Sequence, residues 1–325
     1  MMDVVYSRER FNPKLMSIFL GLMLMIWGGA LAAWGMLDMD SAAALFIAYV
    51  GLFVGVGLGS FLAFGDRKRQ MGRRIMMVMI GTLLLFVALT SDHGNMQIEG
   101  LFFGGLLLAP YIILHYALAK IVGPLIFGRV WCGWACWFGM VFDLLPYKHS
   151  RYRRPGDWGK LRYLHFGLSL VIVLTLWFAF DYQGGALGET GMVWFVGGLL
   201  LYYATGIGLA FALKDNRAFC KYLCPIAVPL KFSTRFSLLK ITGLTAEHCT
   251  TCEACVEMCP MNIRVKDYVI EGERVLSTEC TLCQTCIHVC PHNALTLSFG
   301  LDVGGKEHVD WEPPRPKVKD RSETP

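Results

Sequence analysis

The chain has 325 residues, of which 55% are hydrophobic and only 17% are charged, and its formal net charge is +5. Average soluble domains carry about 25% charged residues. Together with a mean hydropathy of +0.47, these values exclude an intrinsically disordered chain and argue against an ordinary soluble enzyme. A net charge this small gives no indication of a nucleic-acid partner. We therefore expect a protein that is integral to a membrane.

Six apolar segments are long enough to be candidate transmembrane helices, because a bilayer core about 30 Å thick takes about 20 apolar residues per helix. They are residues 15–37, 41–64, 75–90, 101–119, 161–180 and 192–213. The first is too long for the core of a signal peptide, so we expect it to be retained. In the second, Gly51, Gly55 and Gly59 form overlapping GxxxG motifs, which predict the close approach of another helix. The prediction is a membrane all-α protein with six transmembrane helices.

The loops between these segments alternate in charge. Lys and Arg gather at residues 8–14, 67–74, 148–160 and 214–221. The remaining loops contain no Lys or Arg but carry acidic residues, Glu99 among them; they are residues 38–40, 91–100 and 181–191. Short loops rich in Lys and Arg stay in the cytoplasm. We therefore expect a multi-pass protein of the cell inner membrane, with both termini cytoplasmic and the acidic loops periplasmic.

Residues 120–147 do not fit a simple loop. They are apolar and rich in Trp, but Gly123, Pro124 and Gly128 interrupt them. A seventh full span here would invert the charge alternation that follows. We therefore expect a re-entrant or interfacial helix with its Trp side chains near the lipid headgroups.

The composition divides the chain into four parts. Residues 1–74 are an N-terminal extension of two spans, and residues 75–242 are a four-span membrane core. Residues 243–300 are polar and rich in Cys, which predicts a small α+β domain on the cytoplasmic side. Residues 301–325 are rich in Pro and charge, and we expect them to be a disordered tail.

Eight of the twelve cysteines lie in two runs with the spacing C-x2-C-x2-C-x3-C-P. The first run is Cys249, Cys252, Cys255 and Cys259, and the second is Cys280, Cys283, Cys286 and Cys290. This is the spacing of two-cluster bacterial ferredoxins, in which the fourth cysteine of each run ligates the other cluster. The prediction is two [4Fe–4S] clusters: one on Cys249, Cys252, Cys255 and Cys290, the second on Cys280, Cys283, Cys286 and Cys259.

Zinc and disulfides are the alternatives for these eight cysteines. Structural zinc usually takes paired C-x2-C knuckles separated by a longer spacer. Disulfides are rare on the cytoplasmic side, where thiols are kept reduced. The two four-cysteine runs therefore favour iron–sulfur clusters.

The remaining four cysteines form two pairs with one spacing, C-x3-C. They are Cys132 with Cys136 and Cys220 with Cys224. On a helix, residues i and i+4 share a face, so each pair presents two thiols to one site. Pro225 disfavours helical backbone at Cys224, whereas Trp137 follows the first pair, where we expect the backbone to stay helical. Together the pairs supply four sulfurs, enough for a third cluster or a soft metal ion such as copper; a dithiol site or buried free thiols are the alternatives.

Two histidines fall inside expected spans. His115 and His165 lie in the cytoplasmic thirds of the fourth and fifth. Such residues can ligate a haem, a copper ion or a quinone headgroup, but we favour hydrogen-bonded packing residues. The sequence has no C-x-x-C-H haem run, no nucleotide-binding fingerprint and no nucleophile–base triad, so no catalytic residue is predicted.

The twin pairs, in "GRVWCGWAC" and "FCKYLCP", followed by a two-cluster ferredoxin motif, resemble the NapH-type membrane polyferredoxins. The resemblance covers about residues 75–300. This group includes the quinol-oxidising ferredoxin-type subunit of periplasmic nitrate reductase systems. It also includes the polyferredoxin parts of the nitrous-oxide reductase activator and of the cytochrome oxidase accessory protein linked to copper reduction.

The resemblance implies a carrier of single electrons between the quinone pool, or another membrane redox partner, and a partner protein. Other redox subunits of a membrane complex would then be its partners. A second hypothesis is a metal-handling assembly factor that reduces copper for a respiratory enzyme, with the twin pairs as its copper or thiol site. A third is a membrane anchor for a larger reductase.

Overall fold

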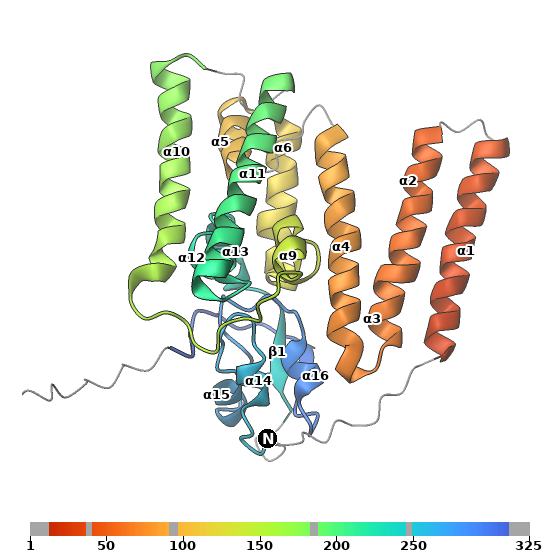
Figure 1. The fold of residues 1–325 in the computed structure, drawn as a ribbon, viewed down its shortest axis with the longest axis vertical. Helices are drawn as coiled ribbons and strands as arrows, with labels where there is room; N and C mark the ends of the chain where they lie inside the picture. The colour runs from red at the N-terminus through yellow and green to blue at the C-terminus, as the bar shows by residue number, and fades with distance from the viewer. Residues whose placement is uncertain (1–12, 37–40, 91–96, 183–187, 245–248, 312–325) are drawn as a thin grey trace, which may run out of the picture.

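The computed structural model describes residues 13–36, 41–90, 97–182, 188–244 and 249–311. Long helices stand side by side, and a small unit of short helices and two strands packs against one end of them (Figure 1). We call helices α4 to α13 the bundle, and residues 239–300 the C-terminal unit. Three apolar clusters form the core, two in the bundle and one in the C-terminal unit.

The N-terminal hairpin lies beside the bundle. Its elements are α1 (Pro13–Met36), α2 (Ser41–Leu52), the π-helical turn η1 (Phe53–Leu58) and α3 (Gly59–Ala63). A Cβ atom on Gly51 would lie 2.9 Å from the Trp27 ring, and one on Gly55 would meet the side chain of Met23. The helix that the GxxxG pattern predicts is therefore α1 of this chain.

The third expected span is part of a longer helix. Helix α4 (Asp66–Thr90) begins nine residues before the expected start at 75. Its first turns therefore carry the basic residues that were expected in a loop. They bring Gln70 to the C-terminal unit, where its Nε2 donates to the Cys283 carbonyl oxygen at 3.3 Å.

The fourth expected span, residues 101–119, is wrong. Two helices occupy this region: α5 (Ile98–Leu106), and α6 (Pro110–Tyr116) with its continuation through η2 (Ala117–Val122) and α7 (Gly123–Phe127). The helix breaks because Leu108 has a φ of +50° and Pro110 can only begin a new helix. The expected loop 91–100 is also wrong at its end, since Gln97 caps α5 and Glu99 lies within it.

The interrupted segment turns sharply, as the glycine and proline pattern predicts. Gly128 has a φ of +58°. The helical stretch Val130–Phe142, made of α8 (Val130–Trp134) and α9 (Trp137–Phe142), then bends by 93° from Ile112–Phe127. This geometry fits either a broken span or a re-entrant loop.

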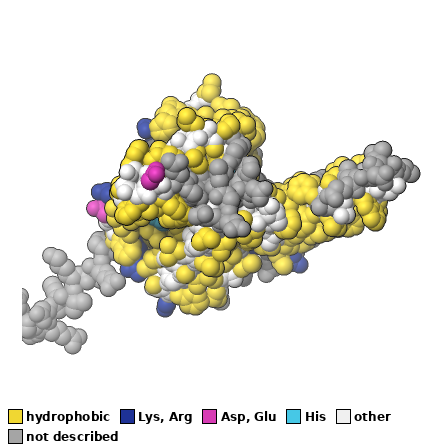
Figure 2. Space-filling view, turned by 90° about the horizontal axis from the view of Figure 1, so that it is seen from above, with side chains coloured by type: hydrophobic (Ala, Val, Ile, Leu, Met, Phe, Trp, Pro, Cys, Tyr) yellow, Lys and Arg dark blue, Asp and Glu magenta, His cyan; other side chains and the backbone are white. Residues whose placement is uncertain are grey.

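The rest of the bundle is built from two long helices and three short ones. They are η3 (Asp157–Lys160), α10 (Leu161–Ala179), α11 (Gly188–Leu213), α12 (Ala218–Tyr222) and α13 (Ala227–Thr234). Seen from the end opposite the C-terminal unit, the described surface is mostly hydrophobic, with a few charged side chains near its edge (Figure 2).

Four helical stretches in the described residues are long and apolar enough to cross a membrane, or five if the bent pair is one span. The four are Ala43–Ala63, Lys68–Thr90, Asp157–Ala179 and Gly191–Leu213. The count of six stays a prediction. Several long apolar helices are nevertheless compatible with a multi-pass membrane protein.

The C-terminal unit combines short helices with a two-stranded antiparallel sheet. Strand β1 (Leu239–Gly243) pairs with β2 (Leu295–Phe299), with Ile241 opposite Leu297. The helices are α14 (Ala254–Glu257), α15 (Val265–Ile270) and α16 (Thr285–Val289). Tyr268 and Met261 are buried between the sheet and the cysteine loops.

Residues 301–311, expected as the start of a disordered tail, are instead packed on the C-terminal unit. The Arg264 amide donates to the His308 carbonyl at 2.9 Å, and the Asp310 amide donates to the Asn262 carbonyl at 2.8 Å. The Arg153 amide of the bundle donates to the Asp310 carbonyl at 2.7 Å. We call residues 301–311 the strap, because backbone hydrogen bonds hold it to both parts. The rest of the expected tail lies outside the described residues.

Candidate metal centres

The twelve cysteines line three cavities, four to each. One cavity is lined by Cys249, Cys252, Cys255 and Cys290, a second by Cys259, Cys280, Cys283 and Cys286, and a third by Cys132, Cys136, Cys220 and Cys224. Among the described residues, no three Cys, His, Asp or Glu side chains come close enough to hold a single metal ion. Each set of four cysteines lines its own cavity.

The two cavities of the C-terminal unit have the same backbone geometry. Each run has non-glycine residues in the left-handed region at three equivalent positions: Thr251 and Leu282, Glu253 and Gln284, Asn262 and Asn293. Left-handed backbone is unfavourable for most side chains, so its repetition indicates a conformation that the surroundings enforce. These turns fold the chain around each cavity.

The fourth cysteine of each run crosses to the other run's cavity. Cys259 lies with the second run and Cys290 with the first. The Ile263 amide donates to the Cys259 sulfur at 3.4 Å, and the Ala294 amide donates to the Cys290 sulfur at 3.3 Å. Hydrogen bonds to ligand sulfurs tune the potential of an iron–sulfur cluster, and this donor set therefore fits one.

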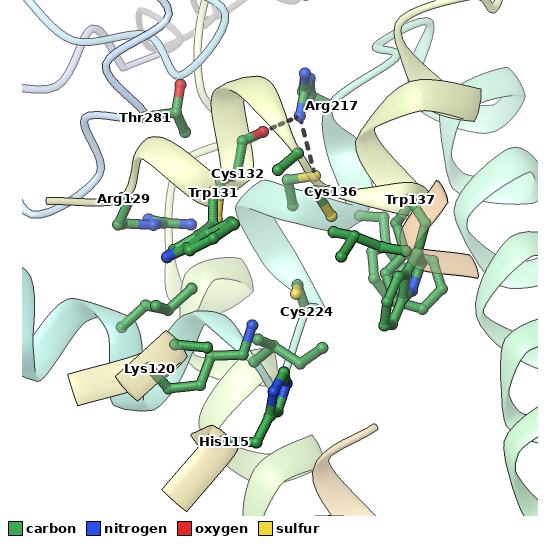
Figure 3. Close-up of a pocket in the computed structure, with 18 residues that line it drawn as sticks. His115, Lys120, Arg129, Trp131, Cys132, Cys136, Trp137, Arg217, Cys224 and Thr281 are labelled. Carbon is green, nitrogen blue, oxygen red and sulfur yellow. Dashed lines mark hydrogen bonds between the residues drawn. The ribbon is translucent and has the colours of Figure 1, made fainter. Parts of the chain in front are cut away.

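The third cavity, which we call the twin-cysteine cavity, lies in the bundle next to the C-terminal unit (Figure 3). Its volume is about 130 Å³. In both pairs the first cysteine lies in a short helix and the second lies two residues past the end of that helix. Cys136 has extended backbone with φ −77° and ψ 121°. The expected helical backbone at Cys136 is therefore wrong, because its carbonyl accepts the Met140 amide and starts α9.

Positive side chains surround the twin-cysteine cavity. Arg217 donates to the Cys132 carbonyl at 3.3 Å, and its Nη1 lies 3.8 Å from the Cys220 sulfur. Arg129 and Lys120 also line the cavity (Figure 3). Burial raises the pKa of the Cys220 thiol, while Arg217 acts in the opposite direction. A positive neighbour favours thiolate, which is the form that binds metal.

Asp143 holds Arg217 in this position. Arg217 donates from Nε and Nη2 to the two carboxylate oxygens of Asp143, both at 2.6 Å, and Arg73 donates to Oδ2 at 2.9 Å. Burial opposes ionisation of Asp143, but the two guanidinium groups hold its pKa well below the ordinary value. Bidentate pairs of this kind fix orientation as well as charge.

Glu279 joins the C-terminal unit to the bundle. It precedes Cys280 and is buried, and four cations of the bundle surround it. The distances to its carboxylate oxygens are 2.6 Å from Lys231, 3.1 Å from Arg162, 3.2 Å from Arg129 and 3.4 Å from Arg153. Burial opposes ionisation of Glu279, but these cations hold its pKa well below the ordinary value.

Thr281 forms a wall between two of the cavities. It lines both the twin-cysteine cavity and the cavity of Cys280. A Cβ atom on Gly133 would collide with the Thr281 carbonyl oxygen, so only glycine permits this approach. Trp134 Nε1 donates to the Leu282 carbonyl at 2.9 Å and holds the same loop.

The two histidines have different positions. His115 lines the twin-cysteine cavity. His165 is not among the residues that line it; its Nδ1 lies 2.9 Å from the Leu223 carbonyl oxygen, and its ring is edge-on to Tyr202 at 5.3 Å. The structure does not bring the two into one site, and His165 fits the interpretation as a hydrogen-bonded packing residue.

Sequence reasoning missed the charged residues of this region. Arg129 and Asp143 stand inside an otherwise apolar segment, and an ionisable residue in such a segment must find a partner. The sequence alone therefore contained a signal for these two residues. Nothing local marks Glu279 as a partner of four cations, because they come from distant parts of the chain.

Comparison with known families supports the iron–sulfur interpretation of all three cavities. A model described as "4Fe-4S binding domain" matches twice, over residues 102–155 and 188–241, and each match contains one C-x3-C pair. A model described as "4Fe-4S dicluster domain" matches residues 248–294 and contains both ferredoxin runs. The expected C-terminal ferredoxin-type domain is therefore confirmed.

Curated relatives are distant. An uncharacterized protein of Methanocaldococcus jannaschii, MJ0749, is 29% identical over 50% of this chain and 64% of its own. The methylamine utilization ferredoxin-type proteins MauN of Methylobacillus flagellatus and Paracoccus denitrificans are each 27% identical, over 52% and 46% of this chain and 66% and 60% of theirs. The chain thus spans less than two thirds of each of these relatives. No solved structure matches.

These findings show 4Fe–4S domains of the ferredoxin type in this chain and a distant similarity to MauN. The specific resemblance to NapH-type proteins stays a prediction.

Proposed function

We propose that the chain is a membrane-integral electron carrier with three [4Fe–4S] clusters, one in each cysteine-lined cavity. The observation that carries this proposal is the division of twelve cysteines into three sets of four, each around its own space. Four sulfurs around a space suit a cluster better than one copper ion, which needs its ligands to converge. A bound cluster takes up and releases single electrons.

The ligands would be those that line each cavity. The two clusters of the C-terminal unit would have Cys249, Cys252, Cys255 and Cys290, and Cys259, Cys280, Cys283 and Cys286. The third would have Cys132, Cys136, Cys220 and Cys224. Arg217 and Arg129 would offset the negative charge that thiolate ligands bring into a buried site.

The contact between the bundle and the C-terminal unit would carry electrons between two of the sites. Thr281 separates the twin-cysteine cavity from the cavity of Cys280 by the thickness of one residue. Gly133 allows the shortest approach, and Glu279 keeps the C-terminal unit in register. The chain itself would thus provide the path from the membrane part to the ferredoxin-type part.

The electron partners would be the quinone pool, or another membrane redox partner, on one side and a protein on the other. The apolar helices and the charge alternation of the loops support a position in the cell inner membrane, with the C-terminal unit in the cytoplasm. The MauN relatives bear ferredoxin-type names, which supports transfer to a protein partner.

Metal analysis of single variants tests this proposal. Anaerobically purified protein should hold about twelve iron atoms. Cys132→Ser should lose about four of them, while the spectra of the ferredoxin-type clusters stay intact. Trp131→Phe, which changes the wall of the same cavity without removing a sulfur, is the matched control. An iron content of about eight, unchanged by Cys132→Ser and Cys220→Ser, would reject the third cluster; stoichiometric copper would favour a copper-handling protein.

A further inference from the structure

Within the part of the chain that the structure describes, Glu99 is an acidic residue of the bundle that forms no ion pair with Lys or Arg. Its Oε1 accepts hydrogen bonds from Ser169 Oγ at 2.7 Å and from the Tyr202 hydroxyl at 3.2 Å. Its Oε2 is shielded from solvent and has no hydrogen-bond partner among the described residues. By contrast, the three acidic residues that are buried outright in the described chain each pair with Arg or Lys; they are Asp143, Asp215 and Glu279.

The position of Glu99 is deep in the bundle. Ser169 lies ten residues before the end of α10, and Tyr202 lies fourteen residues after the start of α11. At 1.5 Å per residue, these positions are about 15 Å and about 21 Å from the ends of the two helices. The partners of Glu99 therefore lie about halfway along α10 and α11 rather than at the ends of these helices. A charged group in such surroundings is costly without a partner.

We propose that Glu99 is an exchangeable proton site whose occupancy is linked to the redox state of the twin-cysteine site. In the neutral acid, Oε1 keeps its two hydrogen bonds and Oε2 carries the proton. An unpaired carboxylate in apolar surroundings is disfavoured, and this favours uptake of a proton whenever negative charge is added nearby. The linkage rests on the proposed cluster at the twin-cysteine site.

Two side chains connect Glu99 with that site. Tyr202 donates to Glu99, and its ring contacts His165 at 5.3 Å. His165 in turn bonds to the Leu223 carbonyl, next to Cys224. The titratable groups that face Glu99 from the packed helices are Tyr202, with His165 behind it, and Tyr116, whose hydroxyl donates to the Gln97 carbonyl. Among the described residues, Glu99 has no ion pair with Lys or Arg.

The linked step involves one electron and one proton. One electron enters the twin-cysteine site from the redox partner, or from dithionite in the test. One proton moves from water to a carboxylate oxygen of Glu99, where an O–H bond forms. Oxidation returns the electron to the acceptor and the proton to water. No other bond changes.

Reduced-minus-oxidised infrared difference spectroscopy of the full chain in lipid nanodiscs tests the proposal. The wild type should show the C=O band of a protonated carboxyl in the reduced state, shifted in D2O. Glu99→Gln should lose this band, and Tyr202→Phe should shift it. Glu271→Gln removes an exposed carboxylate of the C-terminal unit and should leave it unchanged. On reduction with dithionite, Glu99→Gln should take up fewer protons than the wild type, as measured with a pH-indicator dye.

Three results would overturn the inference: a band that persists in Glu99→Gln, a wild type without any such band, or a band that does not shift in D2O. Iron content and paramagnetic resonance of the same samples report the twin-cysteine cluster separately. If that cluster is absent, the redox linkage is rejected together with the proposed function. A pH titration of the oxidised protein then tests the proton site alone: an acid-induced band that Glu99→Gln removes supports it, and its absence rejects it.

Discussion

Two regions of the molecule give an acidic side chain opposite surroundings. One is the contact between the bundle and the C-terminal unit, and the other is the interior of the bundle. At the contact, Glu279 is surrounded by four cations, and its pKa lies well below the ordinary value. In the interior, the partners of Glu99 among the described residues are two hydroxyl groups. The first arrangement fixes a charge in place, whereas the second holds a carboxyl group by hydrogen bonds from neutral hydroxyl groups. The difference indicates that ionic pairs hold the C-terminal unit in position, and it is the basis of the proton site proposed for Glu99.

The largest effect is expected for Glu279→Gln. The amide keeps the shape of the side chain but removes the anion shared by four cations, of which the three arginines are buried, and this should destabilise the contact by about 3–5 kcal/mol. Thermal unfolding, monitored by the protease sensitivity of the C-terminal unit, measures this loss of stability. Glu271→Gln, at an exposed pair with Lys306, should change little. A small effect of Glu279→Gln would show that apolar packing, not charge, holds the two parts together.

A smaller effect is expected for Gly133→Ala. The added methyl group would collide with the Thr281 carbonyl oxygen, so the contact must open at a cost of about 1–3 kcal/mol. Electron transfer between the bundle and the C-terminal unit should slow, as measured by rapid-mixing reduction kinetics, while iron content stays the same. Gly105→Ala is the matched control, because nothing lies within 4 Å of its added Cβ. Equal rates in the two variants would contradict a route through Thr281.

The smallest effect on stability is expected for Glu99→Gln. The neutral amide resembles the protonated acid and accepts the same hydrogen bonds, so the free energy of unfolding should change by about 1 kcal/mol or less. The same unfolding assay that serves for Glu279→Gln measures it. A loss as large as that of Glu279→Gln would mean that Glu99 carries a permanent charge, and the contrast between the two regions would disappear.

The cysteines that share a cavity are those that the local spacing groups together, because two or three intervening residues limit where a thiol can reach; their role as cluster ligands stays a prediction. The crossing of Cys259 and Cys290 between cavities follows from the run spacing alone. The backbone of Cys136 did not follow from its neighbours, since the break there depends on α9 packing into the bundle rather than on a proline.

Features that depend on tertiary structure were not predictable from the sequence. Charge alternation placed Glu99 in a loop, because a loop and the start of a short buried helix contain the same residue types. Composition placed the strap in a disordered tail, because its ordering comes from backbone hydrogen bonds that any sequence can make. The partners of Glu279 come from residues 129 to 231 and leave no local trace.

The strap also fixes an order of events during biosynthesis. Its residues leave the ribosome after both ferredoxin runs and after the last long helix, since synthesis proceeds from the N-terminus. The bonds of Asp310 to Asn262 and Arg153 therefore cannot form before both ferredoxin runs have been synthesised. Until then the C-terminal unit is a nascent segment whose eight cysteines have already emerged. Docking onto the bundle is completed only when the strap closes over a unit that is otherwise ready to receive its iron.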